Sequence, residues 1–219
     1  DWDPAFIDKI ALNNRVIIFD NVGIGLTEGT TPSSILEIIH DAKRFADSIG
    51  LEKFNILGWS LGGIIAQVFT LNYPTSVNKI VLVGTGPGAS AETVYPGEKF
   101  LKLAHKDENT PDDHQVLFFT ETVEGRDETL RSLNRIGKRA VTPIPPTKKE
   151  SWLKQALAMR DFFSSSKNYF AQLKEIKHEV LIGGAKQDLA FPFIDSYLLA
   201  RELPNSQLIT YSNAGHGFH

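Results

Sequence analysis

The chain has 219 residues, of which 42% are hydrophobic, and this excludes an intrinsically disordered protein and allows a sizeable core. Its 23 basic and 26 acidic side chains give a net charge of −3, which argues against nucleic acid or an anionic membrane as partner, since both attract clustered positive charge. The absence of cysteine excludes a disulfide framework, a cysteine nucleophile and cysteine-ligated metal sites. No apolar run approaches the roughly 18 residues that a membrane span needs.

The first half of the chain alternates buried strands with amphipathic helices. The β-branched run Arg15–Asp20 predicts a strand buried on both faces. Thr31 is a good N-cap with Pro32 at the first helical position, and apolar residues at helical spacing follow until Gly50.

The same rhythm continues to the end of the chain. Four further strands are predicted at residues 54–57, 79–83, 179–182 and 207–211, with helices after residue 60 and over residues 193–203. Strands that alternate with helices indicate an α/β fold with a mostly parallel, doubly wound sheet.

Residues 87–177 break this alternation because they contain no convincing strand. Helices are predicted around residues 98–106, 112–120, 128–136, 148–163 and 168–176, and three prolines keep residues 142–146 in a loop. We expect this stretch to be a helical insertion at the edge of the sheet.

The clearest chemical motif is Gly58-Trp59-Ser60-Leu61-Gly62, which lies between a predicted strand and a predicted helix. A tight strand-to-helix turn exposes the serine oxygen at a helix N-terminus, and we expect the two glycines to avoid a Cβ clash there. The alternative is an ordinary glycine-rich turn with an N-cap serine. The flanking strand and helix favour a nucleophile.

Two later loops supply the partners that a serine nucleophile needs. His216, between two glycines after the last strand, is the candidate general base, with His219 as its rival. Asp188, after the penultimate strand, is the candidate acid, although it could instead only form a turn before the next helix. Asp195 is a weaker candidate because it lies inside that helix.

The chain order Ser60, Asp188, His216 is the order of the α/β-hydrolase triad, and the sequence resembles that family over nearly the whole core. The segment 20–27 resembles the family's D-x-R-G-x-G-x-S turn, except that Val22 replaces the usual arginine and Thr27 the serine. The resemblance implies a core formed by residues 1–86 and 178–219, and a helical cap at residues 87–177.

This resemblance also implies the activity. We expect a hydrolase that cleaves a small carboxylic ester or related acyl substrate, with Ser60 as nucleophile, His216 as base and Asp188 orienting it. The Leu61 N–H is the expected oxyanion donor and Trp59 a substrate-binding residue. We expect a cytoplasmic protein that uses no cofactor and no metal.

Three alternatives remain open. A carbon–carbon bond hydrolase, a lyase or a perhydrolase could use the same triad, and a ligand-binding relative could keep the fold without catalysis. Residues 84–89 formally match the dinucleotide fingerprint G-x-G-x-x-[GA], but Pro87 opposes the helix that the fingerprint requires.

We also expect the working protein to be longer than this chain. Residues 2–12 resemble the helix that, in the family, follows a central strand and a turn with the second oxyanion donor, and neither is present before Asp1. The chain also ends three residues after His216, where the family adds a helix. The resemblance therefore predicts a strand and glycine-rich turn upstream and a helix downstream.

Overall fold

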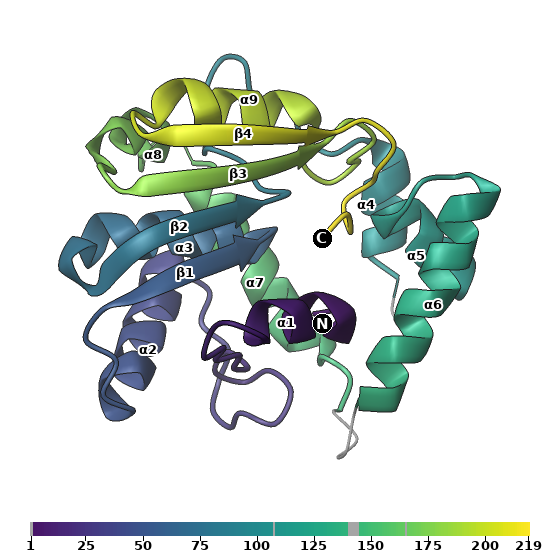
Figure 1. The fold of residues 1–219 in the computed structure, drawn as a ribbon, viewed down its shortest axis with the longest axis horizontal. Coiled ribbons are helices and arrows are strands. Elements are labelled where there is room, and N and C mark those ends of the chain that lie inside the picture. The colour runs from purple at the N-terminus through teal and green to yellow at the C-terminus, as the bar shows by residue number, and fades with distance from the viewer. Residues whose placement is uncertain (1, 107, 140–144, 165) are drawn as a thin grey trace.

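The fold is centred on a four-stranded parallel sheet (Figure 1). The computed structural model describes residues 2–106, 108–139, 145–164 and 166–219. The strands are paired in the order β1-β2-β3-β4. Their bounds are β1 (Phe54–Trp59), β2 (Val77–Val83), β3 (Glu179–Ala185) and β4 (Ser206–Tyr211). Four of the five predicted strands and the α/β fold class are therefore confirmed.

The main hydrophobic core lies on one face of the sheet, where α3 (Leu61–Asn72) contacts β1 and β2, and α9 (Phe193–Glu202) contacts β3 and β4. Helix α2 (Ile35–Ser48) packs on α3, and the core also includes buried residues of the segment 158–176. Alternate strand residues point into this core, and those that are almost fully buried are Ile80, Leu82, Val180 and Ile182. On the opposite face Leu181, Ile209 and Tyr211 are exposed.

The remaining helices lie before the sheet begins, directly before β2 and between β2 and β3. They are α1 (Pro4–Ala11), the short η1 (Pro74–Ser76), α4 (Glu98–Ala104), α5 (Pro111–Phe118), α6 (Val123–Arg139), α7 (Lys149–Phe162), α8 (Tyr169–Gln172) and η2 (Leu173–Glu175).

Each helix predicted between β2 and β3 has a counterpart, and α4, α5 and α6 lie beyond the carboxyl ends of the strands (Figure 1). Of the loop predicted at 142–146, residues 142–144 lie outside the described residues. The division into a core and a cap stays a prediction.

The predicted strand at Arg15–Asp20 is wrong. This segment has no regular secondary structure and makes no ladder hydrogen bonds with the described strands, and Ile18 and Phe19 are about half exposed. Phe19 instead stacks on Phe45 of α2 at 4.7 Å between ring centroids. A β-branched run favours extended backbone, but a strand forms only where another strand lies within hydrogen-bonding reach.

The predicted start of the second helix is also wrong. Helix α2 begins at Ile35, with Ser34 in the N-cap position, rather than at Pro32. Thr31 is buried, and its hydroxyl donates to the Gly23 carbonyl at 3.2 Å, so it fixes the preceding turn instead of capping the helix.

Within the described ranges, no helix combines the length and the apolar character needed to cross a membrane.

Candidate active site

Ser60 lies at the turn between β1 and α3 in a strained backbone conformation. Its φ of +56° is in the left-handed region that residues other than glycine rarely adopt. Two hydrogen bonds hold it there: its N–H donates to the Val83 carbonyl at 3.0 Å, and the Thr85 hydroxyl donates to its carbonyl at 2.8 Å. The turn places Ser60 immediately before the first helical N–H groups, which include that of Leu61 and have no partners within the helix.

Of the two glycines of this turn that were predicted to avoid a Cβ clash, the structure requires one. A Cβ on Gly58 would lie 2.2 Å from the Gly62 carbonyl oxygen, so the prediction for Gly58 is confirmed. A Cβ on Gly62 would meet nothing within 4 Å, so the prediction for Gly62 is wrong. The close approach on that side occurs at Gly63, whose Cβ would lie 2.5 Å from the Thr85 side chain.

The structure brings His216 and Asp188 together as a buried pair. The Nδ1 atom of His216 lies 2.8 Å from Oδ2 of Asp188, and the two residues are 3% and 4% exposed. A carboxylate at Nδ1 favours the tautomer in which that nitrogen carries hydrogen, which leaves Nε2 to accept a proton.

Asp188 also forms the turn that was the alternative explanation for it. Its other oxygen, Oδ1, accepts hydrogen bonds from the N–H groups of Ala190 and Phe191, both at 2.8 Å. One oxygen therefore closes a turn and the other contacts the imidazole, so Asp188 can be both a turn-forming residue and the partner of His216.

Aromatic side chains surround the imidazole and link it to the serine turn. The rings of Trp59, Phe118 and Phe191 lie 5.1, 6.0 and 5.9 Å from that of His216. Trp59 directly precedes Ser60, and its indole N–H donates to the His216 carbonyl at 3.0 Å. Within the described residues the Ser60 hydroxyl has no hydrogen-bond partner, and catalytic contacts of this kind are often long before substrate binds.

The rival residues lie nearby but without the same partners. His219 packs its ring against Trp59 at 4.6 Å and Trp2 at 5.2 Å, and burial lowers its pKa to about 4, with His216 adding to that effect. Asp195 is 1% exposed in the first turn of α9 and makes no contact with either histidine among the described hydrogen bonds and ion pairs. The structure therefore pairs Asp188 with His216 rather than with His219.

The contact between the loop after β2 and the His216–Asp188 pair was not predicted from the sequence. Gly84, at φ +50°, would place a Cβ 3.2 Å from both Asp188 Oδ2 and His216 Nδ1, so only glycine lets the pair approach this loop so closely. No helix begins within residues 84–97, all of which are described, so the dinucleotide fingerprint lacks its required element. The sequence signal that could have indicated this close approach is Gly84, a glycine directly after a strand.

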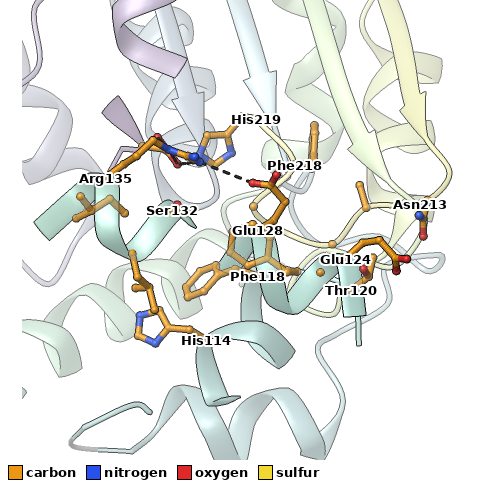
Figure 2. Close-up of a pocket in the computed structure, with 18 of the residues that line it drawn as sticks. His114, Phe118, Thr120, Glu124, Glu128, Ser132, Arg135, Asn213, Phe218 and His219 are labelled. Atoms are coloured by element: carbon orange, nitrogen blue, oxygen red, sulfur yellow. Dashed lines mark hydrogen bonds and ion pairs between the residues drawn. The ribbon is translucent and has the colours of Figure 1, made fainter. Parts of the chain in front are cut away.

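A cavity of about 410 Å³ adjoins this arrangement on the side of α5 and α6 (Figure 2). Trp59, Phe118, Gly215 and His219 contribute to its wall, so it reaches the residues that contact His216. Figure 2 shows its charged wall as well, with Glu124, Glu128 and Arg135 on α6. Ser60, Asp188 and His216 are not among its described lining residues, so the cavity adjoins the triad rather than containing it. A space of this size next to the triad can hold part of a small-molecule substrate.

Comparisons with known proteins agree with this geometry. The model of the alpha/beta hydrolase fold family matches residues 2–219. The putative carbamate hydrolase RutD of Agrobacterium fabrum is 26% identical over 217 residues, covering 98% of this chain and 80% of that protein. A 2-hydroxy-6-oxononadienedioate/2-hydroxy-6-oxononatrienedioate hydrolase of Paraburkholderia phymatum is 25% identical over 211 residues, or 92% of this chain and 70% of that one.

A solved structure shows the same similarity in three dimensions. An alpha/beta hydrolase fold protein from Chitinophaga pinensis matches 99% of this chain and 77% of its own, with a TM-score of 0.88 and 27% identity. The residues matched by the family model, 2–219, include the serine turn, the acid loop and the histidine loop. The chain belongs to the α/β-hydrolase fold family.

Proposed function

We propose that the protein is a serine hydrolase that cleaves a small, uncharged carboxylic ester or related acyl substrate. The observation that supports this most is the buried His216–Asp188 pair, at 2.8 Å, joined through the Trp59 indole to the strained turn that carries Ser60. Base, orienting acid and nucleophile then come from three separate loops at one end of a parallel sheet.

In the first half of the proposed reaction, Ser60 Oγ attacks the acyl carbon while His216 Nε2 takes its proton. Asp188 stabilises the imidazolium, and the Leu61 N–H donates to the oxyanion. The intermediate then collapses, and its carbon–oxygen bond to the alcohol breaks. His216 returns the proton to the departing alcohol, and an acyl-Ser60 ester remains.

In the second half, water replaces the alcohol. His216 takes a proton from that water as it adds to the acyl carbon, and then returns it to Ser60 Oγ as the acid leaves. No cofactor takes part in either half.

The charges around the cavity favour a neutral substrate over a dicarboxylate. The cavity wall includes the carboxylates of Asp3, Glu124 and Glu128. Among the described lining residues Arg135 is the one Lys or Arg, beside two histidines, and its guanidinium already binds the Asp3 carboxylate at 2.6 to 3.0 Å. An incoming dianion would therefore be repelled by three carboxylates, with the one guanidinium among the described lining residues already paired.

A carbon–carbon bond hydrolase with the same triad is the second candidate, because the relative from Paraburkholderia phymatum is named a hydrolase of 2-hydroxy-6-oxononadienedioate, a keto acid that contains no ester bond. The relative from Agrobacterium fabrum, named a putative carbamate hydrolase, extends the acyl group to carbamates. In our proposal residues 87–177 form a cap that selects among these substrates, and the protein acts in the cytoplasm.

A fluorophosphonate probe tests the proposal, because it phosphonylates only an activated serine. We expect the probe to label Ser60 in the wild type, and Ser60→Ala to abolish both labelling and hydrolysis of p-nitrophenyl esters of graded chain length. Loss of the nucleophile from such a triad costs on the order of 10⁶ in kcat. The exposed Ser33 provides a matched control, since Ser33→Ala should label and turn over as the wild type does.

Three results would contradict the proposal. A folded wild type that is not labelled would favour a non-catalytic ligand-binding relative. Ser60→Ala with more than about a thousandth of the wild-type esterase rate would rule out the acyl-enzyme route. Labelling with cleavage of a dienedioate, but of no ester, would favour the second candidate.

A further inference from the structure

Asp195 is a buried acidic residue for which the triad has no use. It lies in the first turn of α9, and the residue is 1% exposed. Its Oδ1 atom is fully buried and has no hydrogen-bond partner within the described part of the chain. An ionised carboxylate in that position would be destabilising, because no donor among the described residues replaces the water that Oδ1 has lost.

Gln67 of α3 has the same kind of unpaired atom. Its Nε2 donates to the carbonyls of Gly63 and Gly86, each at 3.0 Å, so these two acceptors fix which way the amide points. That orientation leaves Gln67 Oε1, also fully buried, without a donor among the described residues. The side chain therefore joins the first turn of α3 to the loop after β2, with one acceptor left over.

The two unpaired oxygens belong to side chains that both approach Gly86. Gln67 Nε2 bonds the Gly86 carbonyl, and a Cβ on Gly86 would lie 3.5 Å from Asp195 Oδ2. Both unpaired atoms are acceptors, so a donor is missing from this region. A protonated carboxyl group supplies one, because its O–H donates.

The surroundings of Asp195 favour that proton. Burial, together with the like charge of Asp188, raises the pKa of Asp195 to about 7. Asp188 differs from Asp195 in its contacts, since it accepts two backbone N–H bonds and also contacts His216, whereas Oδ1 of Asp195 has no partner among the described residues. On α9 itself, Arg201 is in the last turn and is occupied by Glu92 and Glu202.

We propose that Asp195 is a positioning residue that works as a neutral carboxylic acid. Its O–H donates to the side-chain oxygen of Gln67, directly or through one buried water. This bond joins α9 to α3 behind Gly86 and holds the serine helix, the loop after β2 and the acid loop in register. It does so without a second negative charge beside Asp188 and His216.

Infrared spectroscopy at pH 6 tests the protonation state directly. A protonated carboxyl has a carbonyl stretch that is separate from the carboxylate bands and shifts in heavy water. We expect that band in the wild type and its loss in Asp195→Asn, whereas the exposed Asp127→Asn should retain it. A missing band, or a band that survives in Asp195→Asn, would overturn the proposal. If Asp195→Asn does not fold, carboxyl NMR of wild type with labelled aspartate decides the question by the same criterion.

Activity provides the second measurement. Asp195→Asn keeps a donor of similar shape, so it should retain most of the wild-type kcat/KM, whereas Asp195→Ala should lose roughly tenfold because Gln67 Oε1 is left without a donor. Equal losses in the two variants would mean that the charge is what matters, and would contradict the proposal. The infrared band should persist in the inactive Ser60→Ala variant, so failure of the proposed hydrolase reaction would leave the Asp195 result unaffected.

Discussion

Replacing Asp3 by asparagine should destabilise the protein by weakening the contact between α1 and α6. Asp3 is the N-cap of α1, where its Oδ1 accepts from the Ala5 N–H at 2.9 Å. The same carboxylate accepts two bonds from Arg135 Nε, at 2.8 and 3.0 Å, and one from Nη2 at 2.6 Å. Asparagine can still cap the helix, so Asp3→Asn removes mainly the charge pairing.

The magnitude follows from the pKa of the carboxyl group. Burial alone would raise the pKa of Asp3, but hydrogen bonds from Arg135, Ser132 and the Ala5 N–H outweigh it and lower the pKa from 3.8 to about 2. At about 1.4 kcal/mol for each pKa unit, this lowering corresponds to about 2.5 kcal/mol of stability at neutral pH. Since the Arg135 side chain is 36% exposed, water compensates in part. We therefore expect a loss of between about 1 and 2.5 kcal/mol.

Urea unfolding at pH 7 and at pH 3 measures this effect. A lowered pKa gives stability that is present above the unfolded-state value of 3.8 and is lost as the pH falls towards about 2. About half of the difference between the wild type and Asp3→Asn should therefore remain at pH 3. A double-mutant cycle with Arg135→Gln isolates the pair. An equal effect at both pH values, or no effect at pH 7, would refute the reasoning.

Three further predictions concern the site itself. Asp188→Asn should lower kcat/KM by about 10⁴, because the same change in a serine protease triad has that effect through the imidazole tautomer. Asp195→Asn should change kcat/KM little, and the reverse result for the two variants would contradict our choice of acid. Gly63→Ala should lower the free energy of unfolding by about 1 to 3 kcal/mol through the contact with Thr85, while Gly62→Ala, which meets open space, should be neutral or stabilising in the same thermal melts. The pKa of Asp195 is raised in the folded protein, so the wild type should lose stability relative to Asp195→Asn as the pH rises from about 4 to about 7. A difference in the free energy of unfolding that does not change with pH would show that this carboxyl does not titrate in that range.

The serine turn could be predicted because its signals are local. Gly58 and Ser60 lie between a β-branched strand and an apolar helix, and these patterns depend only on neighbouring residues. Asp188 and His216 each follow a predicted strand, which places both in loops at the carboxyl ends of strands, and a parallel sheet brings such loops together.

Other features could not be predicted because they depend on tertiary neighbours. The run Arg15–Asp20 has the composition of a strand, but whether it pairs depends on which backbone lies beside it. Asp195 resembles an ordinary acidic residue in a first helical turn, and its burial depends on tertiary neighbours such as Gly86 of the loop after β2. Gly63 rather than Gly62 proved to be the crowded position because Thr85 comes from a distant strand end.

The divided role of the Asp188 carboxylate couples local folding to activity. The oxygen that holds the Ala190 and Phe191 N–H groups and the oxygen that orients His216 belong to one rigid, planar group, so neither contact can shift without the other. Fraying of this short turn would rotate the carboxylate and release the imidazole while the sheet and its helices remain folded. Mild heat or denaturant should therefore inactivate the protein before its far-ultraviolet dichroism changes, and dilution should restore activity on the fast timescale of a loop rather than that of refolding.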